Sequence, residues 1–205
     1  MSCYSRLFRY ANHGERMEAL LVSAGVVALA EIGDKTQLLA LVLAARFRAP
    51  APVILGILTA TLANHLAAGW VGTLLAAHMN PGVMRWALAL SFFGTAVWMF
   101  IPDKQPEGQA RASRFGAYGT TVIAFFLAEI GDKTQLATVA LAARYQQLVP
   151  VVGGTTLGML LANVPVVFLG GAAASRIPIK LVNRVAAAAF IVLGVLALMG
   201  HTGLE

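Results

Sequence analysis

The ten residues LAEIGDKTQL occupy positions 29–38, and the same ten residues occur again at positions 127–136. The two copies are 98 residues apart, and 14 of 18 positions are identical between 29–46 and 127–144. Each copy places two acids and a lysine inside a long apolar stretch. Ionisable groups in such surroundings are costly, so they indicate a site by default. The repeat therefore bears on both the organisation of the chain and its function.

The composition is typical of an integral membrane protein. Apolar residues make up 59% of the 205 residues and charged residues only 12%, and the mean hydropathy is +0.76. A soluble domain has about twice that share of charge. The net charge of +6 comes from basic residues scattered between apolar runs, which predicts a lipid bilayer as partner and no nucleic acid. A single cysteine, Cys3, and four scattered histidines exclude a Cys- or His-based zinc site.

Six apolar segments have the length of about 20 residues that a span requires. They are residues 19–44, 52–77, 83–101, 117–142, 149–174 and 183–200. Three spans per half is an odd number, so the second half enters the membrane in the opposite sense. We predict an all-α integral membrane protein with six transmembrane helices in two inverted three-helix repeats. Its predicted parts are a tail at 1–16, a first repeat at 17–101, a central cytoplasmic loop at 102–116 and a second repeat at 117–205.

Basic residues predict the orientation, because Lys and Arg accumulate in cytoplasmic loops. Eight lie in the first, third and fifth loops, and five lie on the opposite side, three of them in the N-terminal tail. This count places both termini outside the cytoplasm. A start at Met17 instead of Met1 would change the count to eight against two, and we keep it as a hypothesis. Ala28-Leu29-Ala30 imitates a signal-peptide cleavage site, but the internal copy at 127–129 argues against cleavage.

Placed on a continuous helix, residues three and four apart share a face, so Glu31, Asp34 and Lys35 lie close together. Two such helices from the two halves could gather four carboxylates and two lysines, with a formal charge of −2. That charge suits one divalent cation, and oxygen ligands suit calcium, magnesium or manganese. The predicted metal ligands are Glu31, Asp34, Glu129 and Asp132. Supporting residues are Gly33, Lys35, Thr36, Gln37, Asn64, Gly131, Lys133, Thr134, Gln135 and Asn163.

Crowded carboxylates also bind protons, so metal and protons would compete for the same oxygens. Alternate opening to the two sides would turn that competition into cation/proton antiport. The main alternative is a scaffold in which Glu31–Lys35 and Glu129–Lys133 are structural ion pairs. An intramembrane enzyme is a further alternative, although no Ser-His or Cys-His arrangement supports it. Helix packing is the simpler interpretation of the small residues at Gly56/Ala60 and Gly154/Gly158, and a packed polar residue is that of His65.

Both copies match the pattern E-x-G-D-[K/R]-[T/S], at residues 31–36 and 129–134. This duplicated signature resembles that of the Gdt-type family of manganese and calcium cation/proton exchangers, over nearly the whole chain after residue 16. The resemblance implies that the motif acids bind the cation and that no cofactor is permanently bound. It also implies a bacterial inner-membrane protein that transports Mn²⁺, with Ca²⁺ as the alternative, and H⁺. The residues themselves leave open the choice of metal, the number of metal sites, the proton stoichiometry and the oligomeric state.

Overall fold

The computed structural model describes residues 13–101, 115–169 and 179–200, and within these ranges all regular secondary structure is helical. Most of the predicted tail and of the predicted central loop lies outside the described residues. The first half contains α1 (His13–Glu31), α2 (Lys35–Phe47), α3 (Pro50–His78) and α4 (Pro81–Trp98). The second half contains α5 (Gly116–Glu129), α6 (Lys133–Tyr145), α7 (Leu148–Leu169) and α9 (Ile179–Leu198).

The two copies of the motif break the first and fourth predicted spans into pairs of helices. α1 ends at Glu31 and α2 begins at Lys35, and α5 and α6 are separated in the same way. Gly33 and Gly131 adopt positive φ angles of 84° and 75°, which glycine tolerates at a helix C-terminus. Our expectation of a continuous helix through the motif was therefore wrong. Each copy instead turns the chain at the place where the charged residues lie.

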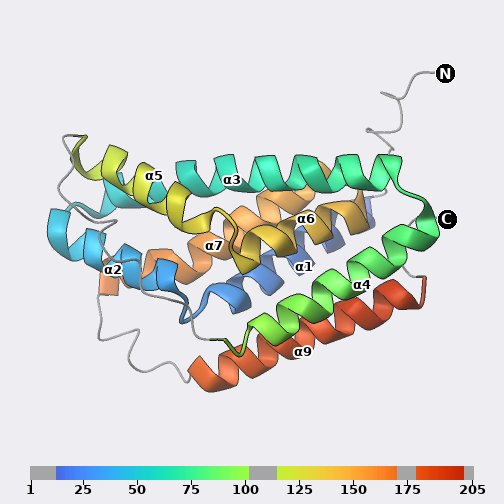
Figure 1. Ribbon diagram of the computed structural model, residues 1–205. Helices are drawn as coiled ribbons and strands as arrows, with labels where there is room; N and C mark the ends of the chain where they lie inside the picture. The colour runs from blue at the N-terminus through green and yellow to red at the C-terminus, as the bar shows by residue number, and fades with distance from the viewer. Residues whose placement is uncertain (1–12, 102–114, 170–178, 201–205) are drawn as a thin grey trace, which may run out of the picture.

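The helices of the two halves run in opposite senses along the bundle (Figure 1). α1 and α2 run from right to left in the figure, α3 returns, and α4 runs to the left again. α5 and α6 run from left to right, α7 returns, and α9 runs to the right. As a result, the start of α1, the α3–α4 turn, the α6–α7 turn and the end of α9 lie at the same end of the bundle.

Small residues let α7 pack directly on α1, and α3 on α5. A Cβ added to Gly154 would lie 2.3 Å from the Leu20 carbonyl oxygen, and one added to Gly158 would lie 2.5 Å from that of Ala24. On α3, a Cβ added to Gly56 would lie 2.6 Å from Cβ of Thr121. These contacts confirm helix packing at the predicted small-residue faces, and they bring α7 and α3 against the two helices that end in glutamate.

Gly158→Ala is expected to lower the free energy of unfolding by about 1–3 kcal/mol, the usual cost of overpacking. Its added methyl group would meet backbone atoms of α1, including the Ala28 amide nitrogen at 2.9 Å. Gly153 provides the matched control on the same helix, because its added Cβ meets nothing within 4 Å. Thermal unfolding of the two purified variants in detergent tests this. Equal stability of Gly158→Ala and Gly153→Ala would contradict the close packing of α7 on α1.

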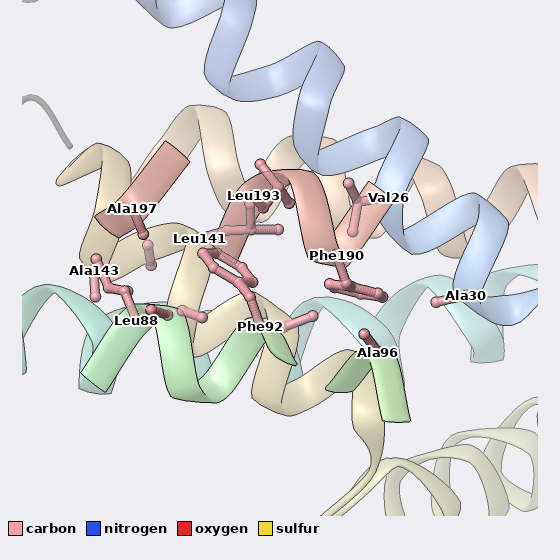
Figure 2. Packing of buried hydrophobic residues seen from close by; sticks show 14 of the residues in the cluster. Val26, Ala30, Leu88, Phe92, Ala96, Leu141, Ala143, Phe190, Leu193 and Ala197 are labelled. Atoms are coloured by element: carbon pink, nitrogen blue, oxygen red, sulfur yellow. The ribbon is translucent and has the colours of Figure 1, made fainter. Parts of the chain in front are cut away.

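The buried apolar residues form two clusters. One lies between α1, α4, α6 and α9 and is centred on Phe92 and Phe190, whose ring centroids are 6.4 Å apart (Figure 2). These two residues are 98 positions apart, so equivalent residues of the two halves meet. The other cluster joins α1, α2, α3, α5 and α7 around Ile57 and Phe125.

The outer surface is apolar. Leu90, Val149 and Phe168 are 67%, 77% and 64% exposed, and exposed apolar area on this scale marks contact with another apolar phase. Three of the described helices, α3, α7 and α9, are by themselves long and apolar enough to cross a membrane. Together with the composition, these features identify a membrane protein.

Candidate cation site

Two glutamates lie at the helix ends that the motif creates. Glu31 is the last residue of α1 and Glu129 is the last residue of α5, and both are fully buried. One carboxylate oxygen from each of Glu31, Glu129 and Asp132 lies within 4.8 Å of the others. The structure thus brings carboxylates from both halves together, as the sequence predicts. The C-terminal end of a helix carries partial negative charge, which disfavours the charged form of these glutamates unless a positive charge compensates.

The threonines of the motif bind one oxygen of each glutamate and leave the other without a partner. The Thr36 hydroxyl donates to Oε2 of Glu31, and the Thr134 hydroxyl donates to Oε2 of Glu129 at 3.2 Å. Within the described residues, Oε1 of both glutamates is buried and has no hydrogen-bond partner. A buried carboxylate oxygen without a partner is costly. A cation or a proton bound to these oxygens would remove that cost.

The two aspartates are the N-cap residues of α2 and α6, and the lysines that follow them reach across to the other half. Oδ1 of Asp34 accepts the amide of Lys35 at 2.7 Å and so caps α2. The side-chain nitrogen of Lys35 lies 2.8 Å from Oδ1 of Asp132, and that of Lys133 lies 3.3 Å from Oδ1 of Asp34. The expected ion pair of Lys35 along its own chain with Glu31 is replaced by a bridge between the repeats.

The glutamines hold the helix breaks. Oε1 of Gln37 accepts the amide of Gly33 at 3.0 Å, and Oε1 of Gln135 accepts that of Gly131 at 2.7 Å. The amide nitrogen of Gln37 also donates to the Ala162 carbonyl of α7 at 3.0 Å. We predicted these glutamines as oxygen donors near the cation. In this structure the oxygens fix the turns that position the carboxylates.

Two parts of the chain, residues 19–107 and 117–205, match the family model described as "Divalent cation/proton antiporter GDT1". The chain belongs to this family. It is therefore a transporter and not an enzyme, and one matched part lies in each half of the chain.

The chain is also similar to a protein of Vibrio cholerae serotype O1. It is 49% identical over 178 residues, which cover 86% of the present chain and 88% of the relative, and its name is "Putative manganese exporter". No solved structure matches the chain. The GDT1 family and this relative both agree with transport of a divalent cation.

In this GDT1-family chain, the two asparagines lie on the helices that pack against α1 and α5. The side-chain amide of Asn64 donates to the Phe126 carbonyl of α5 at 3.1 Å, which ties α3 to the helix that ends in Glu129. Asn163 donates within α7 to the Met159 carbonyl at 3.0 Å. Asn64 therefore has a positioning role in this structure. His65 is fully buried, as expected of a packed polar residue, and it is not part of the three-carboxylate group.

Proposed function

We propose that the protein exports Mn²⁺ in exchange for protons. Glu31, Glu129 and Asp132 bind the metal, and Asp34 completes the acidic cluster through its ion pair with Lys133. The observation that carries this proposal is the meeting of three buried carboxylates from both halves, two of them with an unpartnered oxygen. The family of cation/proton antiporters supports exchange for protons, and the name of the Vibrio relative supports export and the choice of Mn²⁺.

A divalent cation fits the charge and the chemistry of the cluster. Four carboxylates and two lysines leave a formal charge of −2. Carboxylate oxygens suit hard cations such as Mn²⁺ and Ca²⁺. The binding metal would repel the ammonium of Lys35 from Asp132 and free the oxygen that the lysine contacts at 2.8 Å. Lys35 thereby acts as an internal counter-ion when no metal is bound.

Protons would compete with the metal for the same oxygens. Metal binding requires deprotonated carboxylates, so metal uptake releases protons and proton uptake favours metal release. If only the metal-loaded and the protonated forms change the side to which the site opens, the two flows are coupled in opposite directions. A proton gradient directed into the cell would then drive export.

The transport proposal includes a membrane arrangement with six crossings. α1 with α2 and α5 with α6 each form one broken span, and α3, α4, α7 and α9 form the other four. Broken helices whose ends meet at mid-membrane are typical of ion sites in transporters built from inverted repeats. The opposite senses of the helices in Figure 1 support this arrangement. The basic residues favour both termini outside the cytoplasm of a bacterial inner membrane.

The deciding experiment is Mn²⁺ flux into proteoliposomes under an imposed pH gradient, with a proton-sensitive dye recorded in parallel. We expect Mn²⁺ and protons to move in opposite directions, and a parallel assay with Ca²⁺ decides between the metals. If folded protein moves neither Mn²⁺ nor Ca²⁺ under any gradient, the transport proposal fails. The bridges between the repeats would then be a structural lock.

Mn²⁺ is also expected to stabilise the purified protein. At 100 times its Kd, a ligand that binds only the folded state adds about 2.7 kcal/mol. This stabilisation should weaken as the pH falls, because protons compete for the carboxylates. Thermal unfolding with and without Mn²⁺ at several pH values measures both effects. A Glu31→Gln variant that Mn²⁺ stabilises to the same extent would exclude this cluster as the binding site.

A further inference from the structure

The two halves are not packed alike, although their motifs are nearly identical. α4 and α9 form an antiparallel pair that packs against α6 through α4 and against α1 through α9. The equivalent contacts in the other half would be α9 with α2 and α4 with α5, and neither is among the extensive helix contacts. Figure 1 shows α2 at the left, beyond the left-hand ends of α4 and α9. The pair therefore covers α6 and leaves α2 uncovered.

Equivalent residues show the difference directly. Val42 on α2 is 49% exposed, whereas its counterpart Ala140 on α6 is 3% exposed. Ala45 is exposed, whereas Ala143 lies in the buried cluster between α1, α4, α6 and α9 (Figure 2). The uncovered face of α2 is the counterpart of the face of α6 that α4 covers.

The candidate cation site is correspondingly more open on the side of α2. The side chain of Lys35 is 19% exposed, whereas that of Lys133 is 5% exposed. Because α2 and α6 end at opposite ends of the bundle (Figure 1), the site is closed towards one end and more accessible from the other.

Two residues at the end of α6 fasten the closed side. Arg144 is buried and donates to the Leu193 carbonyl of α9 in a long hydrogen bond of 3.5 Å. The Tyr145 hydroxyl donates to Glu18 of α1 at 3.3 Å. The counterparts in the first half are Arg46, which is exposed, and Phe47, which has no hydroxyl. The counterpart of Glu18 is Gly116, so the second contact has no equivalent at the other end.

We propose that the α4–α9 pair is the gate of the transporter, and that Arg144 and Tyr145 hold it closed on the α6 side. In the opposite state the pair leaves α6 and covers α2 through α9, with Arg46 in the buried position. The inference rests on the proposed transport function. It adds which helices move, which residues hold them, and that the Tyr145–Glu18 contact favours the state seen here.

The pair is built to move as one body. Phe92 and Phe190 stack at the point where equivalent residues of α4 and α9 meet. A Cβ added to Gly194 would lie 2.7 Å from the ring of Phe93, so the two helices are also in close contact next to these two rings. The receiving face on α2 is apolar, with Leu38 and Val42 exposed, so a helix can pack against it as α4 packs against α6.

Cysteine pairs can test the two states in a Cys3→Ser background. Leu88 and Ala143 belong to the same buried cluster (Figure 2), so a short bifunctional thiol reagent should cross-link cysteines at these positions. Their counterparts, 98 positions away, are Ala186 on α9 and Ala45 on α2. We expect cysteines at 45 and 186 to cross-link in the opposite state. Conditions that increase cross-linking of one cysteine pair should decrease cross-linking of the other.

The gate residues are tested by Tyr145→Phe, which gives α6 the aromatic residue that α2 has. Loss of one hydrogen bond should increase cross-linking at 45–186 relative to that at 88–143, and the ratio of the two should rise about two- to tenfold. Phe47→Tyr is the matched control, and it should change neither, since Gly116 offers no carboxylate.

Three outcomes overturn the gate proposal. They are no cross-link at 88–143, no cross-link at 45–186 in protein that transports, and an equal rise at both pairs in Tyr145→Phe. Cross-linking reports on helix packing and needs no transport, so it tests the gate proposal independently of the transport proposal. Reciprocal cross-linking in protein that moves no cation would refute the transport proposal alone.

Discussion

Glu31→Gln is expected to abolish Mn²⁺ transport while leaving a folded protein. Glutamine keeps the size of the side chain, and its carbonyl oxygen can still accept the Thr36 hydroxyl. The substitution removes one of the negative charges that bind the cation, and one of the groups that carries protons. Changes next to metal ligands cost about 10–100-fold in affinity or activity, so loss of a ligand should cost more than about 100-fold. Proteoliposome flux and Mn²⁺ binding measure the effect.

Glu129→Gln should have the same defect, because the repeat gives both glutamates the same place at a helix end. Glu15→Gln is the control on α1, since Glu15 is exposed in the first turn and far from the motif. Gel filtration and thermal unfolding establish that each variant is folded. Normal flux in either Glu31→Gln or Glu129→Gln would refute the proposed site.

The sequence predicted the positions of the helices well but not the break within the motif. Apolar length defines α3, α4, α7 and α9, and the prolines at 50 and 81 mark two of their starts. The apolar segment from 19 to 44 has the length of one membrane span, which favoured one helix. Glycine followed by aspartate is also the usual signature of one helix ending and another beginning. That signal was present in both copies and would have predicted the turn.

The sequence predicted which residues gather but not how they pair. Two identical motifs in two halves indicate that Glu31 and Glu129 approach each other. Whether Lys35 pairs along its own helix or across the repeat depends on the turn at Gly33. The turn separates Lys35 from Glu31 and directs it to Asp132. Likewise, Arg46 and Arg144 both follow Leu-Ala-Ala, and which of the two is buried depends on where α4 and α9 lie.

A double-mutant cycle on Lys133 and Asp34 is expected to show strong coupling between the two halves. Both side chains are buried, and their charged atoms are 3.3 Å apart. Removal of one member of a buried ion pair typically costs about 3–5 kcal/mol, because the other charge is left uncompensated. Lys133→Met and Asp34→Asn should each destabilise strongly. The double variant should be more stable than the sum of the two losses predicts, by about 0.5–3 kcal/mol.

The same cycle with Lys133→Met and Glu129→Gln separates this structure from a continuous helix. In a continuous helix Lys133 would lie one turn from Glu129, and that pair would carry the larger coupling. With the turn at Gly131, the coupling should be larger for Asp34 in the other half. Thermal unfolding of the purified single and double variants gives both values. Larger coupling to Glu129 would show that each motif neutralises itself, whereas larger coupling to Asp34 means that the site exists only when the two repeats are joined.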